Sequence, residues 1–317
     1  MPFVILGEII LHKQKPLFTL IIPAYNSSDT IRECFESVIN QTCKDFEVFI
    51  VDDGSHDDTL RICQDILTER PEMAGKAFIC PLEHRGPSHA RFHGCQRANG
   101  EYIVHIDSDD TISPNFLAEI SKVISSHPDM DFDLIRFGAR RDAVGEGAKH
   151  EHRFHCDYSE NMYTAHDFLD ASITKGSATS FSCICLYAYR TEMYRNDRFP
   201  DGCHEDIAHM PHMILKAKNI FCMNGIDIYN YSYVATSFSH HPAEDKTIMR
   251  FLHFQEAMRT AICSIKDSDL PEEKKAKFIK FYEDLRDIRQ ENKVLKWVGN
   301  ANQRAGYDKF FYKGTGI

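Results

Sequence analysis

Short apolar runs separated by amphipathic stretches organise the first part of the chain. Four runs rich in β-branched, aromatic and aliphatic residues lie at residues 17–22, 46–51, 77–80 and 102–106. Their lack of polar alternation is typical of strands covered on both faces. Between them apolar residues recur at helical spacing, most clearly at Ile31, Cys34, Phe35, Val38 and Ile39. Strands that alternate with helices in this way predict a doubly wound, mainly parallel α/β sheet with right-handed connections.

The pattern becomes less regular in the second part of the chain. Further strands are expected at residues 134–137, 182–189 and 226–233, and helices at 165–172 and 210–216. Residues 142–158 are polar and glycine-containing, and predict a loop. Two long helical periods at residues 247–265 and 272–296 predict an αα-hairpin that packs against the preceding domain.

Composition describes an ordinary globular protein and excludes some partners. Of the 317 residues, 43% are apolar and 26% are charged, which provides ample material for a core. The 37 Lys and Arg residues against 47 Asp and Glu residues give a formal net charge of −10, so nucleic acid is not an expected partner. No apolar run approaches the length of a membrane span. Eleven cysteines without paired spacing indicate reduced thiols and a cytoplasmic location.

Acidic residues follow two of the predicted parallel strands. Asp107, Asp109 and Asp110 come directly after one strand, and Asp52 and Asp53 end another. Because the carboxyl ends of parallel strands meet at one edge of a sheet, these side chains should lie close together. Hard oxygen ligands of this kind suit Mg²⁺ or Mn²⁺. The alternative is an acidic turn that caps the helix after it.

The usual phosphate-binding glycine motifs are missing from the sequence. No GxGxxG follows the first strand, and no GxxxxGK[ST] occurs anywhere. This argues against a nicotinamide dehydrogenase and against a P-loop hydrolase. The phosphates of a nucleotide would instead need a divalent cation, which the acidic strand ends could hold.

Five motifs in order resemble the inverting glycosyltransferases of family 2, which have the GT-A fold. They read IIPAYN (21–26), VDDGSHDDT (51–59), GPSHAR (86–91), ANGEYIVHIDSDDTISP (98–114) and HED (204–206). The resemblance is strong over residues 17–117, weaker to Asp206 and absent beyond about residue 235. It implies a nucleotide-sugar donor, usually linked to UDP, and a saccharide or lipid-linked acceptor. The family association makes bacterial surface polysaccharide the expected pathway.

The resemblance assigns the donor and metal sites residue by residue. By this match Pro23, Ala24 and Tyr25 line the site of base and ribose, and Asp53 accepts a hydrogen bond from the base. A carboxylate suits the imide N–H of uracil because it is a pure acceptor. The remaining assignments place Asp107 and Ser108 at the ribose, Asp109 with Asp107 at the metal, and Arg85 and Arg91 on the uracil and diphosphate side. The family often carries Asn where this chain has His84, which leaves the base-edge contacts open.

Asp206 is the expected general base because it matches the family's Glu-Asp signature. Glu205 beside it would orient the acceptor or cap the helix. The alternative is that both acids only load the first turn of a helix with favourable negative charge. The family often has an aromatic residue at the position of His209, and Pro211 follows it, so a later helix start or a kink is expected here.

The resemblance also divides the chain. Residues 1–15 form a lead-in, residues 16–235 a catalytic domain and residues 236–317 a helical region; within the domain, 16–117 bind the nucleotide and 118–235 the acceptor. A basic patch at Lys274, Lys275, Lys277 and Lys280 and an aromatic tail leave peripheral contact with the inner face of the membrane open. Two other functions also stay open, a nucleotidyltransferase and a degenerate transferase that binds a nucleotide sugar without turnover.

Overall fold

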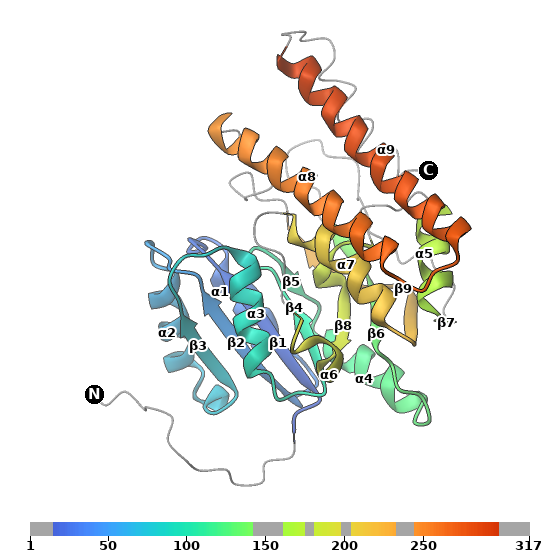
Figure 1. The fold of residues 1–317 in the computed structure, drawn as a ribbon. Helices are drawn as coiled ribbons and strands as arrows, with labels where there is room; N and C mark the ends of the chain where they lie inside the picture. Colours follow the sequence, from blue (N-terminus) through green and yellow to red (C-terminus); the bar gives the residue numbers. More distant parts are fainter. Residues whose placement is uncertain (1–14, 142–160, 175–180, 198–203, 233–243, 298–317) are drawn as a thin grey trace, which may run out of the picture.

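A single mixed sheet organises the computed structural model, which describes residues 15–141, 161–174, 181–197, 204–232 and 244–297. Within these residues the sheet has nine strands in the order β3-β2-β1-β4-β8-β6-β9-β5, and β7 pairs with β9 (Figure 1). The strands are β1 (Phe18–Ala24), β2 (Phe46–Asp52), β3 (Ala77–Pro81), β4 (Tyr102–His105), β5 (Thr111–Ile112), β6 (Leu134–Arg141), β7 (Asn161–Tyr163), β8 (Tyr187–Arg190) and β9 (Ile220–Tyr231). The predicted fold class is confirmed.

Helices cover this sheet and extend beyond it. The α-helices are α1 (Ile31–Ile39), α2 (Thr59–Glu69), α3 (Pro87–Arg97), α4 (Phe116–Ser126), α5 (Ala165–Thr174), α6 (Thr191–Tyr194), α7 (Glu205–Lys216), α8 (Glu244–Lys266) and α9 (Glu272–Trp297). Two short 3-10 helices, η1 (Pro71–Met73) and η2 (Ile184–Leu186), complete the described elements.

The parallel half of the sheet is the part that the apolar runs predicted. Strands β3, β2, β1 and β4 all pair in parallel, and every residue of β1, β2 and β4 is buried. Helix α3 packs on β1 and β2 so closely that a Cβ at Gly94 would lie 2.6 Å from the Ile21 Cγ2 atom. This tight contact fixes the helix that carries one of the site residues.

Several element boundaries differ from the sequence expectation, and β6 and β9 are longer than expected. Strand β1 continues through Pro23 to Ala24, because Pro23 pairs in register with Val51 of β2 instead of ending the strand. The strand expected at residues 182–189 is a 3-10 turn, η2, followed by the shorter β8. The expected lead-in apart from Lys15, the loop at 142–158, the boundary near 235 and the tail beyond residue 297 lie outside the described residues.

The two C-terminal helices form the predicted αα-hairpin. Helix α8 packs against α7 and α9 packs against α8, with Phe254, Met258 and Phe278 among their buried residues (Figure 1). The lysines of the basic patch have carboxylate partners: Lys274 and Lys277 pair with Asp170 of α5, Lys275 with Glu272 and Lys280 with Asp284. Among the described helices none has the length and apolar character needed to cross a membrane.

Replacing Asp170 by asparagine should loosen the attachment of α9. The Asp170 carboxylate lies 2.8 Å from the Lys274 ammonium and 2.7 Å from that of Lys277. Burial raises the pKa of Asp170, but hydrogen bonds and charges from these lysines lower it more, so the net shift is downward. Because its pKa is lowered on folding, Asp170 stabilises the folded protein above about pH 4, and this contribution is lost as the pH falls through the pKa that the group has in the folded protein.

We therefore expect D170N to lower the free energy of unfolding by about 0.5–1 kcal/mol at pH 7, since the pairs are partly exposed and screened. The difference should shrink in acid. Chemical denaturation at pH 7 and pH 3 measures it, with the exposed Asp267→Asn as the control. An equal loss at both pH values would mean that the ion pairs do not hold the helix.

Candidate functional site

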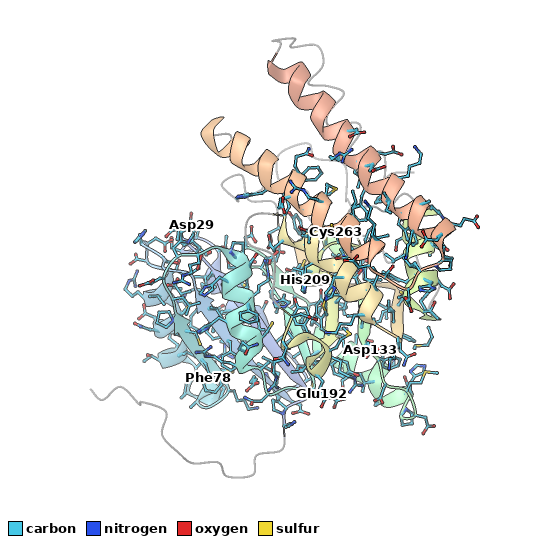
Figure 2. All side chains as sticks on the ribbon, in the orientation of Figure 1. Asp29, Phe78, Asp133, Glu192, His209 and Cys263 are labelled. Carbon is cyan, nitrogen blue, oxygen red and sulfur yellow. The ribbon has the colours of Figure 1, made fainter. Side chains whose placement is uncertain are left out.

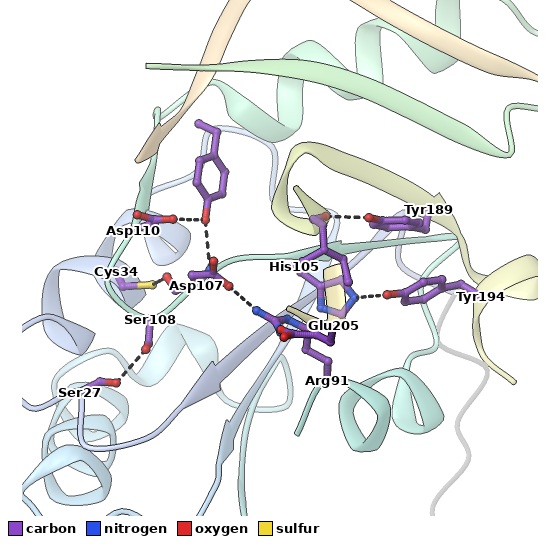
Figure 3. Close-up of polar contacts among 12 residues, drawn as sticks. Ser27, Cys34, Arg91, His105, Asp107, Ser108, Asp110, Tyr189, Tyr194 and Glu205 are labelled. Carbon is purple, nitrogen blue, oxygen red and sulfur yellow. Dashed lines mark hydrogen bonds and ion pairs between the residues drawn. The ribbon is translucent and has the colours of Figure 1, made fainter. Parts of the chain in front are cut away.

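The loops that follow β1, β2 and β4 meet at one edge of the sheet. Parallel pairing places the last residue of β1, Ala24, beside Asp52 at the end of β2. The hydroxyl groups of Ser27 and Ser108, 2.8 Å apart, join the loop after β1 to the loop after β4 (Figure 3). The strand-end residues therefore come together as a parallel sheet requires.

Asp53 organises the loop that precedes α3. Its side chain is buried, and its Oδ1 atom accepts a hydrogen bond from the backbone N–H of Arg85 at 2.9 Å. Its Oδ2 atom accepts bonds from the Gly86 N–H and from the His84 Nδ1 atom, both at 2.7 Å. Gly54, at φ +76°, permits this arrangement, because a Cβ there would lie only 2.9 Å from the backbone nitrogen of His84. Asp53, which is predicted to bind the nucleobase, thus also holds this loop in place.

The residues expected around the base differ in exposure. Pro23 and Ala24 are buried at the end of β1. Tyr25, directly after them, is 41% exposed and stacks on the His84 ring with centroids 4.0 Å apart and planes inclined by 17°. The Arg85 side chain is exposed, and only its backbone bonds to the loop carboxylate. Tyr25 and His84 therefore form a partly exposed aromatic pair beside Asp53.

The acidic loop after β4 is tied to β9 by a buried tyrosine. The Tyr229 hydroxyl donates to Asp110 Oδ2 at 2.6 Å and accepts from the Asp107 N–H at 3.1 Å. Asp110 Oδ1 also accepts from the Ser232 N–H at 2.7 Å. Burial and the charges of Asp107 and Asp109 raise the pKa of Asp110 well above its ordinary value. Asp110 therefore supports the loop from inside the protein.

The same loop carries donor atoms that fit a divalent cation. Ligand atoms of Asp107, Asp110 and Cys185 all lie within 4.8 Å of one another, and Asp109 is a partly exposed member of the same turn. Carboxylate oxygens are the donors that Mn²⁺ and Mg²⁺ prefer. Of the two predicted metal ligands, Asp107 belongs to this set, and the structure does not bring the side chain of Asp109 into it.

Arg91 links the acidic loop to the start of α7. Its buried guanidinium lies 2.8 Å from Asp107 Oδ1 and forms an ion pair with Glu205 (Figure 3). Burial lowers the pKa of Arg91, but the two carboxylates raise it more, so the net shift is upward and the group is charged. Arg91 therefore bridges two segments that are more than ninety residues apart in the chain.

Asp206 lies in the first turn of α7, beside the residue that Arg91 binds. Its Oδ1 atom accepts a hydrogen bond from the Ile207 N–H at 2.8 Å. Burial, together with the negative charge of Glu205, raises the pKa of Asp206 to about 7, while the Ile207 bond and Arg91 act in the opposite direction. A carboxylate that titrates near neutral pH is well matched to general base catalysis.

Helix α7 begins earlier than the sequence pattern suggested. The helix expected at residues 210–216 starts at Glu205 and runs through Pro211, and His204 precedes it in the left-handed conformation at φ +68°. His209 is 3% exposed, lies inside the molecule and packs edge-on against Tyr194 at 5.6 Å (Figure 2). Burial lowers its pKa to about 3, so the ring is neutral. His209 fills the place of an aromatic core residue.

Three contributions to the site were not expected from the sequence. Tyr229 and Ser232 reach the acidic loop from the region of β9, and Cys185 reaches it from η2. The alternating tyrosines of the segment IDIYNYSY gave a weak signal, since one of its faces had to be buried. Nothing in the local sequence of Cys185 indicated its position.

Comparison with known proteins gives a family. A family model described as Glycosyl transferase family 2 matches residues 19–194. Among curated proteins, glycosyltransferase GlyA of Streptococcus pneumoniae is 28% identical over 186 residues, which cover 58% of this chain and 26% of the relative. Chondroitin synthase of Escherichia coli is 43% identical over 103 residues, which cover 32% of this chain and 14% of the relative. The matches thus span about a quarter or less of the length of these relatives.

Solved structures share the fold. S. aureus TarS, residues 1–349, in complex with UDP-GlcNAc superposes with a TM-score of 0.67 at 22% identity, over 94% of this chain and 81% of that chain. The mannosyltransferase PcManGT from Pyrobaculum calidifontis, in complex with GDP-Man and Mn²⁺, gives a TM-score of 0.55 at 19% identity, over 85% and 69% of the two chains. At these identities the likeness concerns the fold.

Proposed function

The chain belongs to glycosyl transferase family 2, and on that premise we propose that it moves a sugar from a UDP-linked donor to an acceptor hydroxyl with inversion. The observation that carries the proposal is the continuous arrangement Asp107–Arg91–Glu205, with Asp206 as the next residue. It places the predicted donor-binding loop and a carboxylate with a pKa of about 7 on either side of one buried arginine. A displacement at the anomeric carbon needs both a site that binds the donor and a base that takes the proton of the acceptor hydroxyl.

The donor side is assigned to the loops after β1, β2 and β4. We place the base at Tyr25 and Asp53, where an aromatic face and a carboxylate acceptor lie together. The ribose and diphosphate would then lie towards Ser108 and Asp107, whose loop is joined to the first by the Ser27–Ser108 contact. The solved relatives that hold UDP, UDP-GlcNAc and GDP-Man support a nucleotide-sugar donor.

Asp107 and Asp109 would hold the divalent cation, Mn²⁺ or Mg²⁺. When bound, it would neutralise the diphosphate and stabilise the charge of the leaving group. One oxygen of Asp107 is already engaged by Arg91, so this side chain is positioned before any ligand arrives. Asp110 is held by Tyr229 and Ser232 and keeps the turn in shape.

Asp206 acts as the base in this proposal. The acceptor oxygen attacks the anomeric carbon, its proton passes to the Asp206 carboxylate, and the bond from the anomeric carbon to the β-phosphate oxygen breaks with its electron pair on that oxygen. Glu205 is bound to Arg91, so we assign it to positioning rather than to contact with the acceptor. In this proposal residues 16–117 carry the donor site. The acceptor binds near Asp206, which belongs to the half of the domain from 118 to 235.

The acceptor is proposed to be a saccharide or a lipid-linked sugar of a bacterial surface polysaccharide. Relatives named chondroitin synthase and hyaluronan synthase support a saccharide acceptor, although the matches cover only 14% and 10% of them. We keep the cytoplasm, at or near the inner face of the membrane, as the proposed location. Membrane contact would have to use cations other than Lys274 and Lys277, because these two bind Asp170.

Replacing Arg91 should change both the rate and its pH dependence. Arg91→Ala leaves Asp107 and Glu205 without their shared cation, and we expect kcat to fall by about 10- to 100-fold as both segments shift. Because Arg91 lowers the pKa of Asp206, its loss should move the rising limb of the pH profile to higher pH. Arg91→Lys keeps the positive charge, so the pH at the midpoint of this rise should lie between the values of R91A and the wild type.

Kinetics between pH 5.5 and 9 measure both effects, with the exposed Arg97→Ala on the same helix as the matched control. A limb that stays in place in R91A would show that the arginine does not act on the base.

Turnover of labelled UDP-sugars tests the proposed function. Purified protein with Mn²⁺ should release UDP from one sugar donor in preference to others, and an acceptor saccharide should speed the release. Binding of a UDP-sugar without any turnover, with or without candidate acceptors, would favour the degenerate binding protein. Release of pyrophosphate from a nucleoside triphosphate would favour the nucleotidyltransferase.

A further inference from the structure

The His84 side chain occupies the two groups that the proposed donor site offers to a nucleobase. Its ring lies on the Tyr25 ring with centroids 4.0 Å apart and planes inclined by 17°. Its Nδ1 atom lies 2.7 Å from Asp53 Oδ2. Since a carboxylate only accepts, this nitrogen must carry the proton and act as the donor. The imidazole therefore combines stacking with a ring N–H bond to Asp53.

A uracil ring in the proposed site would need the same two contacts. It would stack on the exposed tyrosine and donate its imide N–H to the same carboxylate. Both rings cannot use one face of Tyr25 and one oxygen of Asp53 at once. We propose that His84 is an internal competitor of the nucleobase, which must be displaced from Tyr25 and Asp53 before UDP binds. This inference rests on the proposed function.

The loop is built so that the side chain can leave while the backbone stays. The backbone N–H groups of Arg85 and Gly86 bond to Asp53 at 2.9 and 2.7 Å, independently of the imidazole. Gly54 lets the loop backbone approach closely, which fixes it further. By contrast, the His84 side chain is 52% exposed and has room to turn into solvent. Its displacement thus leaves two of the three side-chain bonds of Asp53 intact.

Competition of this kind lowers the apparent affinity for the donor. The apparent dissociation constant is the intrinsic one divided by the fraction of molecules in which the site is open. If the docked imidazole is present in about 70–90% of molecules, its removal should tighten UDP binding about three- to tenfold. A ligand without a base does not need Tyr25 or Asp53, so its affinity should stay the same.

Calorimetric titration with UDP and with inorganic pyrophosphate, both in Mg²⁺, tests the inference. H84A should bind UDP about three- to tenfold more tightly than the wild type and pyrophosphate equally well. H84F keeps a ring on Tyr25 but cannot donate to Asp53, so it should show a smaller gain. Gln64→Ala, an exposed residue of α2 that has no assigned role in the site, is the control and should change neither affinity.

Asp53→Asn separates this inference from the proposed function. Suppose that D53N weakens UDP binding tenfold or more, whereas H84A does not tighten it. The proposed base site would then be supported, and His84 would be part of that site and not a competitor of the base. If D53N leaves UDP binding unchanged, the base lies elsewhere and both proposals are wrong. Tighter UDP binding by H84A together with weaker binding by D53N is the result that we expect.

Discussion

Asp206→Asn is expected to lower kcat by about 10³-fold while UDP binds with nearly the wild-type affinity. The asparagine cannot take the acceptor proton, and general base catalysis contributes about 10²- to 10⁴-fold. The donor loops should be untouched, because Asp206 lies in the first turn of α7 and accepts its hydrogen bond from the Ile207 N–H of the same helix. Single-turnover transfer kinetics and UDP calorimetry measure the two quantities.

The dependence of kcat on pH also tests the assignment of Asp206 as the general base. With a pKa of about 7, Asp206 is mostly protonated below neutrality, so kcat should rise with pH and level off above about pH 8. This limb should be absent from the residual activity of D206N. Asp65→Asn on α2, an exposed ion-pair residue, is the matched control and should keep both the rate and the limb. Full activity in D206N would remove Asp206 as the base.

Stability should change in the opposite sense to activity. The pKa of Asp206 is raised on folding, so its contribution to stability is complete below about pH 4 and is lost as the pH rises through about 7. D206N removes a charge that its partly buried position disfavours, so it should be more stable than the wild type by about 1–3 kcal/mol at pH 8, a range lowered for the remaining exposure of the residue. Below about pH 4, where Asp206 is protonated in both the folded and the unfolded state, the two proteins should unfold alike.

Asp109→Ala is expected to abolish most of the metal-dependent binding of UDP. A divalent cation on the diphosphate contributes several kcal/mol of charge stabilisation, so losing its ligand should cost about 100-fold or more in the presence of Mn²⁺. In EDTA, wild type and variant should bind UDP equally weakly. Equilibrium dialysis with and without Mn²⁺ measures the difference.

An exposed acid outside the site provides the control for D109A. Asp129→Ala should behave as the wild type in both buffers. If D109A kept the Mn²⁺-dependent gain in affinity, the ion would be held by other groups, such as the set formed by Asp107, Asp110 and Cys185.

The parallel half of the fold was predictable because its signals are local. Strands β1, β2 and β4 are buried on both faces, which removes polar alternation from their sequences. Their acidic ends had to converge once the strands were parallel. Pro23 was the exception, since it lies within β1 although proline usually ends a strand.

The other half depends on pairing between distant segments, which local patterns do not reveal. Strand β8 inserts between β4 and β6 in antiparallel orientation, and this brings η2 with Cys185 under the acidic loop. Tyr229 reaches Asp110 across 119 residues of sequence. Helix α7 starts before Pro211 rather than after it, and it is stabilised by its packing on α8. Propensity alone would have ended it.

Among the site residues, the role of Arg91 was the hardest to read from sequence. The family match placed it on the uracil and diphosphate side, and that contact stays a prediction. The structure adds an ion pair to Glu205, which joins α3 to the first turn of α7. A helix residue of this type is usually a surface residue, so only the tertiary structure reveals that it is buried.

Titration of the wild-type protein with UDP, with and without Mn²⁺, tests the central claim most directly. Carboxylates at neighbouring strand ends should make UDP binding strongly dependent on the ion, with a Kd at least about 100-fold lower in Mn²⁺ than in EDTA. GDP and ADP should bind less tightly than UDP under the same conditions. Equal UDP affinity in Mn²⁺ and EDTA, or no binding of UDP at all, would contradict the account.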